Sequence, residues 1–350
     1  MWDDAFSPPL LTGDLPGIGG RIKQEPEDFQ VEEVPAYAPC GQGDHLFLWV
    51  EKRDVGAEFF LRELARRLGV PQGEIGTAGM KDRRAVTRQA VSVPAAAEPH
   101  LGRIDGGGIR LLGVSRHTNK LRPGHLRGNR FRVLVRDVAP EKAELLGRLL
   151  GELRGQGVPN YFGPQRFGRD GETARTGMDL LAGRGGKVRT PFLRKLALSA
   201  AQSVLFNLYL ARRLRDGLFR RVLPGDVMNK WPQGGMFVAR DVGEEQARFD
   251  RRETVHTGPM FGRKTFPAEG EAAEREASVL AGAGLSPESF TGFGKLLPGT
   301  RRMNLVYPDD VSASWDAAGV WLSFALPAGS YATVLLREVM KSDVGGDEVA

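Results

Sequence analysis

The sequence predicts an α+β protein with a mainly antiparallel sheet and a second, helix-rich part in the middle of the chain. Three observations predict this fold class. Strand-like and helix-like patterns alternate in the first half, the middle is mostly helical by pattern, and a strand followed by a helix returns at the end. With 350 residues, 41% hydrophobic and 26% charged, the chain is long enough for about two domains.

The first half supplies most of the predicted strands. Apolar alternation and short apolar runs predict antiparallel strands at residues 21–34, 45–53, 88–94, 108–117 and 129–138. A helix is expected over residues 56–69, where an apolar stripe is formed by Phe60, Leu61, Leu64 and Leu68. A second helix is expected over residues 141–154, where leucine recurs every four residues.

The middle of the chain has a different composition. A stretch dense in turn-forming residues, from Gly155 to Gly171, marks a boundary. Beyond it, residues 193–214 are apolar on most sides, which predicts a buried helix at the core of a second domain.

The end of the chain resembles the first half more than the middle. Strand signals resume at residues 320–327, and a helix is expected at 331–340. We therefore expect both ends of the chain to form one discontinuous domain, into which the middle is inserted.

The composition argues against metal and cofactor chemistry. Cys40 is the single cysteine, and the five histidines lack the spacing of a metal-binding pair. The segment 258–265 has one residue too few between its glycines for a phosphate-binding loop. We expect no metal and no cofactor.

The N-terminus carries acidic residues where a signal peptide needs positive charge, and no stretch approaches 18 uninterrupted apolar residues. We therefore expect a cytoplasmic protein that does not enter a membrane. The pattern shows no heptad seam or extended apolar edge, so we also expect a monomer without a protein partner.

Positive charge is concentrated in residues 110–136. The whole chain has a net charge of +6, whereas this segment holds eight basic residues and no Asp or Glu. Alternation along a strand would place Arg130, Arg132 and Arg136 on one face, at a spacing that suits a phosphate backbone. The alternative is a solvated charged face, and a GC-rich coding bias would also explain why 38 of the 49 basic residues are arginine.

Asp82 is the candidate catalytic residue. It lies between Lys81 and the pair Arg83 and Arg84, in a charged turn that is expected to precede a helical turn. Neighbouring cations favour an ionised carboxylate, which can act as a nucleophile or a base. The alternative is a surface turn with an ion pair.

The residues around Asp82 resemble those of a known family. Gly79, Lys81, Asp82, Ala85, Thr87 and Gln89 reproduce the pattern G-x-K-D-x-x-A-x-T-x-Q of the TruD family of tRNA pseudouridine synthases. The resemblance extends over nearly the whole chain, through residues 25–33, 116–131, 158–168, 198–207 and 326–338.

The resemblance implies an enzyme that isomerises uridine to pseudouridine in tRNA, at position 13 in the D arm. It implies a catalytic aspartate, here Asp82, and neither cofactor nor metal. It also implies a pseudouridine synthase catalytic domain with a mainly antiparallel sheet, formed by residues 1–157 and 306–350. This domain would be interrupted by an inserted TRUD domain rich in helix, residues 158–305.

The same resemblance assigns further residues to the substrate site. They are Phe29, Asn129, Phe131 and Tyr331. Tyr331 stands at an aromatic position where Phe is expected. Lys81 is also placed in the substrate site, where it would either orient Asp82 or contact a phosphate. The RNA backbone is expected to contact Arg116, Lys120, Arg122, Arg127, Arg130 and Arg166; the alternative for Arg166 is that it caps the interdomain turn. By composition alone, the two phenylalanines would be core residues and Asn129 a turn residue.

Two other functions are compatible with parts of this sequence. A non-catalytic RNA-binding or ribosome-assembly protein would also need an arginine-rich surface and aromatic residues, but it would not need Asp82. A glycosidase-like hydrolase would need a second acid about 5–10 Å from the first, and none stands near Asp82 in the sequence.

Overall fold

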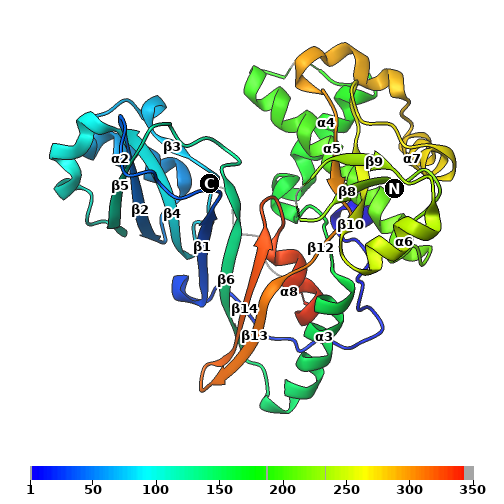
Figure 1. Ribbon diagram of the computed structural model, residues 1–350, viewed down its shortest axis with the longest axis horizontal. Helices are drawn as coiled ribbons and strands as arrows, with labels where there is room; N and C mark the ends of the chain where they lie inside the picture. Colours follow the sequence, from blue (N-terminus) through cyan, green and yellow to red (C-terminus); the bar gives the residue numbers. More distant parts are fainter. Residues whose placement is uncertain (1, 187, 233, 343–350) are drawn as a thin grey trace.

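The computed structural model describes residues 2–186, 188–232 and 234–342. Within these residues a large sheet occupies one side of the molecule and a helix-rich part with a smaller sheet occupies the other (Figure 1). Strands β6 (Leu126–Arg136) and β14 (Gly319–Pro327) of the large sheet, with the helices α3 (Ala143–Gln156) and α8 (Ala332–Met340), lie at the end of this sheet nearer the helix-rich part. This arrangement confirms the predicted α+β class.

The large sheet has eight strands, and the only parallel pairing described in it joins β1 to β4. Its order is β13-β14-β6-β1-β4-β2-β5, and β3 pairs with β4 off this path. The strands are β1 (Phe29–Pro35), β2 (His45–Arg53), β3 (Gly76–Thr77), β4 (Val86–Pro94), β5 (Ile109–His117), β6 (Leu126–Arg136), β13 (Asp309–Asp316) and β14 (Gly319–Pro327).

The expected strand over residues 21–34 is wrong in its first half. Residues Pro26–Asp28 form a 3₁₀ turn, and β1 begins only at Phe29. Pro26 has no backbone N–H to donate to a sheet, and the Asp28 carboxylate accepts the N–H of Glu25 at 3.0 Å, which fixes the turn. The helical turn expected after Asp82 is also wrong, because β4 begins at Val86, which pairs with Gln30.

Helices cover one face of the large sheet. Val31, Thr87 and Lys52 lie side by side across β1, β4 and β2, so they mark one face. On this helix-covered face, α2 (Ala57–Leu68) packs over β2 and β4, and α3 (Ala143–Gln156) and α8 (Ala332–Met340) pack over β1, β6 and β14. We call the opposite face the open face.

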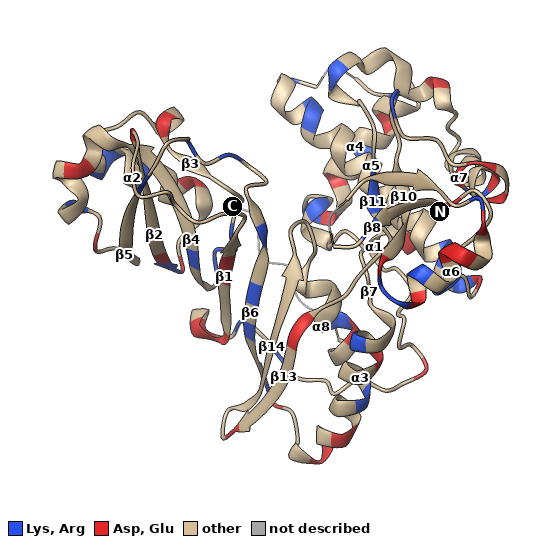
Figure 2. Cartoon of the chain, viewed as in Figure 1, with Lys and Arg blue, Asp and Glu red and all other residues tan. Residues whose placement is uncertain are grey.

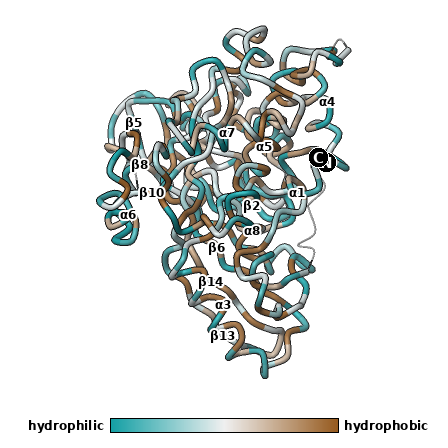
Figure 3. The backbone as a smooth tube through the Cα atoms, turned by 90° about the vertical axis from the view of Figure 1, so that its right-hand side faces the viewer, coloured by the Kyte–Doolittle hydropathy of each residue, from teal (hydrophilic) through white to brown (hydrophobic). Residues whose placement is uncertain are grey.

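The helix-rich part is built around α5 (Pro191–Arg215), which confirms the predicted buried helix. Fourteen of its 25 residues are buried. Figure 3 shows that the segment is largely apolar. Around it lie α4 (Glu172–Leu181), α6 (Val242–Asp250), α7 (Gly270–Gly282) and a sheet of β8 (Val227–Lys230), β9 (Met236–Val238), β10 (Thr254–Met260) and β11 (Thr300–Met303).

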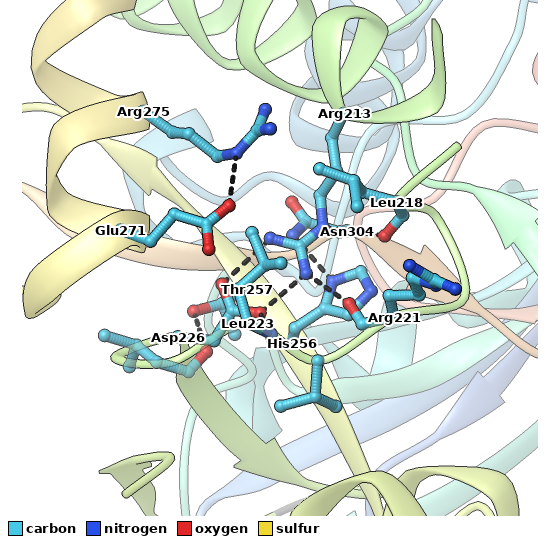
Figure 4. A network of polar contacts seen from close by, with 12 residues as sticks. Arg213, Leu218, Arg221, Leu223, Asp226, His256, Thr257, Glu271, Arg275 and Asn304 are labelled. Atoms are coloured by element: carbon cyan, nitrogen blue, oxygen red, sulfur yellow. Dashed lines mark hydrogen bonds and ion pairs between the residues drawn. The ribbon is translucent and has the colours of Figure 1, made fainter. Parts of the chain in front are cut away.

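A buried polar network fixes α5 to the smaller sheet (Figure 4). Arg213 on α5 donates two hydrogen bonds to Asp226, at 2.8 and 2.6 Å, and both side chains are 1% exposed. His256 on β10 has its Nε2 3.0 Å from the carbonyl oxygen of Phe219 and its Nδ1 2.8 Å from the Asn304 amide. The charges of Arg213 and Asp226 are therefore paired, and both ring nitrogens of His256 have partners, as is usual for buried polar groups.

Two of the chain segments that join the two parts lie side by side. There β7 (Val158–Pro159) pairs with β12 (Leu305–Val306). The short N-terminal helix α1 (Asp3–Phe6) packs against α5, where the Asn207 amide donates to the carbonyl of Ala5 at 2.8 Å. In the part of the chain that the structure describes, no helix is long and apolar enough to cross a membrane.

Candidate active site

Asp82 lies where the large sheet divides. Strand β2 pairs with β4 along one edge, so β1 and β3 must share the other edge. Strand β1 pairs with the first residues of β4, Val86 to Arg88, whereas β3 pairs with Val91 and Ser92. Segment 78–85, which contains Asp82, connects β3 to β4 at this division.

A buried ion pair joins β1 to the Asp82 segment at the point where the sheet divides. The Glu33 carboxylate is 2.7 Å from Lys81 Nζ and accepts the backbone N–H of Ala90 at 3.3 Å. The side chains of Lys81 and Glu33 are 4% and 0% exposed. Lys81, expected in the substrate site, therefore points inward and anchors the Asp82 segment to β1.

A second buried lysine holds the backbone of Asp82. Lys52 Nζ donates hydrogen bonds to the carbonyl oxygens of Val55 and Asp82, both at 2.7 Å, and of Lys81 at 3.3 Å. Burial lowers the pKa of Lys52 from 10.5 to about 8, against the attraction of Asp82. Lys52 therefore fixes the backbone from which the Asp82 side chain projects.

The Asp82 carboxylate itself is reachable from solvent on one side. Its side chain is 33% exposed, and Lys23 Nζ is 3.4 Å from Oδ1 on the other side. Lys23 also lies over the ring of Phe29, 4.3 Å from its centroid. Phe29 is 1% exposed, so it supports Lys23 from within the core.

Asn129 and Phe131 share the helix-covered face with Glu33. In the register of β1 and β6, Val31 faces Phe131 and Glu33 faces Asn129. The Phe131 ring stacks on Phe324 at 5.3 Å and is 7% exposed, so it belongs largely to the core. The buried Oδ1 of Asn129 has no hydrogen-bond partner among the described residues, which leaves an acceptor available.

Tyr331 lies at the boundary of the helix-rich part, immediately before α8. Its ring meets that of Phe162 edge-on, with centroids 6.0 Å apart. Arg302 lies 4.0 Å from the centroid of the same Phe162 ring. None of the contacts described for Tyr331 reaches Asp82.

The predicted RNA-contacting residues do not all lie on one surface. Figure 2 shows basic segments along β6, but Arg130 points to the open face, opposite Phe131, near Glu32 and Asp310. Arg166 bonds to two serines of α5, Ser199 and Ser203. Other partners are Glu98 for Arg116 and the Gly73 carbonyl for Lys120, while Arg122 and Arg127 are exposed.

Lys23, Glu33 and Lys52 contribute to this site although the sequence pattern did not predict them. Lys52 carried a usable signal, because it continues the buried positions 46, 48 and 50 of β2 and is 1% exposed. Glu33 occupies a buried strand position in the same way. Among the described residues, no group of three His, Cys, Asp or Glu side chains could hold a metal ion.

Comparisons with known proteins show which family the chain resembles. The family model for "tRNA pseudouridine synthase D (TruD)" matches residues 8–188 and 185–339. The chain is 46% identical to the tRNA pseudouridine synthase D of Anaeromyxobacter sp. (strain Fw109-5), over 95% of this chain and 96% of the relative. It is 48% identical to that of a Thermus thermophilus strain, over 95% of this chain and 92% of the relative.

A solved structure shows the same fold. The crystal structure of the putative tRNA pseudouridine synthase D from Methanosarcina mazei superposes with a TM-score of 0.79 at 27% identity, covering 98% of each chain. The matches in sequence and in structure both extend over nearly the full length. The chain belongs to the tRNA pseudouridine synthase D (TruD) family.

Proposed function

We propose that this protein isomerises uridine to pseudouridine in tRNA, with Asp82 as the catalytic residue. Membership of the family makes the chain an isomerase. The observation that carries the assignment to Asp82 is its setting: a partly exposed carboxylate on a backbone held by the buried Lys52, at the division of the sheet.

The reaction requires little besides a well-placed carboxylate. The N1–C1′ bond of the uridine breaks, the base turns, and a C5–C1′ bond forms, while C5 loses its proton and N1 gains one. A carboxylate can attack the base or the sugar, or remove a proton from the sugar. The 33% exposure of the Asp82 side chain leaves it accessible to a base that has left its stack.

The other groups have distinct roles in this proposal. Asn129 offers its unpartnered oxygen to a donor on the base edge, and Tyr331 provides an aromatic surface beside Phe162. Phe29 and Phe131 support the site from the core, and Lys81 anchors the catalytic segment through Glu33.

The finer assignments belong to the same proposal. The target is uridine 13 in the D arm, the reaction uses no cofactor, and the protein acts as a cytoplasmic monomer. Arg122 and Arg127, both exposed, contact phosphates. Residues 1–157 and 306–350 form the catalytic domain, into which residues 158–305 are inserted. The pairing of β7 with β12, at the two ends of the insertion, supports this division. Residues 343–350 lie outside the described residues.

The test is tritium release from tRNA labelled at uracil C5 and isolated from cells without this activity. Wild-type protein should release tritium, and Asp82→Asn should bind the tRNA but release at least about a thousandfold less. Asp137→Asn, at an exposed aspartate paired with Arg21, is the matched control and should behave as wild type. Equal release by Asp82→Asn would remove Asp82 from catalysis, and silence from all three with tRNA bound would favour a non-catalytic RNA-binding protein.

A further inference from the structure

We propose that a hollow on the open face of the large sheet is a second nucleobase site, in which an unpaired base of the substrate RNA stacks. The hollow consists of two adjoining cavities of about 260 and 540 Å³ that share Tyr37 and His125. The proposal rests on the proposed function only in taking RNA as the substrate. It concerns a base other than the uridine that reacts at Asp82.

The hollow lies on the face of the sheet opposite Asn129 and Phe131. Phe47 and Trp49 alternate along β2 with Leu48 and Lys52, which belong to the helix-covered face, so their side chains project to the open face. No helix packs on this part of the open face among the described residues, and Trp49 is only partly buried. The hollow is therefore accessible from solvent.

Its aromatic rings are already stacked and held in place. Tyr37 stacks on His117 with centroids 5.1 Å apart and planes inclined by 24°, and Phe47 lies 4.7 Å from the same imidazole. The Tyr37 hydroxyl is 2.7 Å from Nδ1 of His125. Rings fixed in this way lose little conformational freedom when a planar base joins the stack, and Asn119 and the imidazoles supply donors and acceptors for its edge.

Charge identifies the occupant as a polyanion. Lys120 and Arg122 line the larger cavity, and no Asp or Glu lines either one. A second hollow on the open face, of about 290 Å³, differs in this respect, because Glu32 and Asp310 lie there beside Arg88, Arg130 and Arg132. The hollow at Tyr37 therefore combines aromatic walls with basic side chains and has no acidic residue in its lining. Proteins that bind single-stranded nucleic acid use this combination.

The hollow adjoins the segment that carries Asp82. The backbone N–H of Gly124, which lies between Arg122 and His125, donates to the carbonyl of Ala78 at 2.8 Å. Ala78 contributes to the same apolar cluster as Phe47, whereas Ala85 packs in the cluster on the helix-covered face. Ala78 precedes Asp82 by four residues, which span at most ~14 Å. One RNA can therefore reach both places.

The experiment measures the Kd, KM and kcat of three variants with transcribed tRNA. Tyr37→Leu should weaken binding and raise KM by about 5-fold to 150-fold, the range expected for the loss of one base–aromatic stack, with kcat unchanged. Tyr37→Phe keeps the ring but loses the hydroxyl contact with His125, so its Kd and KM should lie between those of wild type and Tyr37→Leu, closer to wild type. Trp321→Leu is the matched control, since Trp321 lies on the same open face beneath Arg132, outside the hollow.

An abasic scan of the unpaired nucleotides identifies the base. At one position, the tRNA that lacks the base should bind wild-type protein as weakly as intact tRNA binds Tyr37→Leu. Combining this abasic tRNA with Tyr37→Leu should weaken binding no further, because both changes remove the same contact. A Kd for Tyr37→Leu equal to that for Trp321→Leu, or fully additive losses at every position, would overturn the proposal.

A further variant covers the case in which Tyr37→Leu does not fold. Arg122→Gln changes an exposed side chain and should reduce the slope of log Kd against log salt by about one unit. An unchanged slope would count against an RNA phosphate at this rim. The Kd measurements do not depend on catalysis. If wild-type protein formed no pseudouridine, the proposed reaction would be rejected, but the Kd values would still test the second nucleobase site.

Discussion

Lys52 Nζ donates a hydrogen bond of 2.7 Å to the backbone carbonyl oxygen of Asp82, from a side chain that is 1% exposed. The ammonium faces carbonyl oxygens rather than a carboxylate in all three of its described hydrogen bonds. The loop conformation at Asp82 therefore depends on a buried charge on the neighbouring strand β2.

Replacing Lys52 should impair the catalytic step more than binding. Lys52→Met leaves the buried carbonyl of Val55 without a donor, at about 1–3 kcal/mol, and the partly buried carbonyl of Asp82 loses the same donor. We expect kcat to fall at least about tenfold with KM changed by less than about threefold. Lys341→Met removes a lysine that bonds to the Thr12 carbonyl at 2.7 Å and is the control. Equal loss of kcat in both variants would show a general effect on folding.

The lowered pKa of Lys52 predicts an alkaline limit to activity. Since this pKa is about 8 in the folded protein and 10.5 in the unfolded chain, the ammonium loses a proton, and with it one donor, above about pH 8. Between these values the unfolded chain binds more protons, so the contribution of Lys52 to the free energy of unfolding rises with pH while kcat falls. A kcat profile with its alkaline limb unmoved in Lys52→Arg would contradict this assignment.

The buried pair of Glu33 and Lys81 should contribute strongly to stability. Lys81→Met leaves the Glu33 carboxylate, 0% exposed, without its cation and should lower the free energy of unfolding by about 3–5 kcal/mol in urea. The double variant Glu33→Leu with Lys81→Met should recover part of this loss, but not the hydrogen bond to Ala90. The exposed pair of Arg21 and Asp137 is the comparison, and Asp137→Asn should change stability by less than about 1 kcal/mol. Similar losses at both pairs would be inconsistent with the burial of the first.

His256 predicts a loss of stability in mild acid (Figure 4). Burial and the nearby Arg213 charge lower its pKa from 6.5 to about 3. Below about pH 6.5 this imidazole binds a proton in the unfolded chain but stays neutral in the folded protein. The free energy of unfolding therefore falls by up to ~1.4 kcal/mol per pH unit, down to about pH 3. His256→Gln should flatten this slope in urea titrations between about pH 6.5 and 5, and an unchanged slope would point to other groups.

Tyr331→Phe should be close to neutral. The edge-on contact of the ring with Phe162, at 6.0 Å, does not use the hydroxyl. We expect kcat/KM within about threefold of wild type, whereas Tyr331→Ala, which removes the ring, should lose about tenfold or more. A large loss in Tyr331→Phe would instead assign the hydroxyl to the substrate.

The local sequence pattern was sufficient to predict the helices and strands whose formation depends on residues close together in the chain. The helix at α2, the buried helix α5 and the strand β2 follow from side-chain periodicity, which the backbone geometry imposes within a few residues. Asp82 stood out through the resemblance of its surrounding motif to one family, and the same resemblance predicted the activity.

Only the tertiary structure decided which side chains around Asp82 meet it. Lys81 adjoins Asp82 in the chain but turns inward to Glu33, 48 residues away, whereas Lys23 and Lys52 reach Asp82 from distant segments. Alternation placed Arg130 opposite Phe131, but helix packing determined which face is covered. Ion pairs and the choice of buried face depend on contacts between residues far apart in sequence, and these form only when the sheet is assembled.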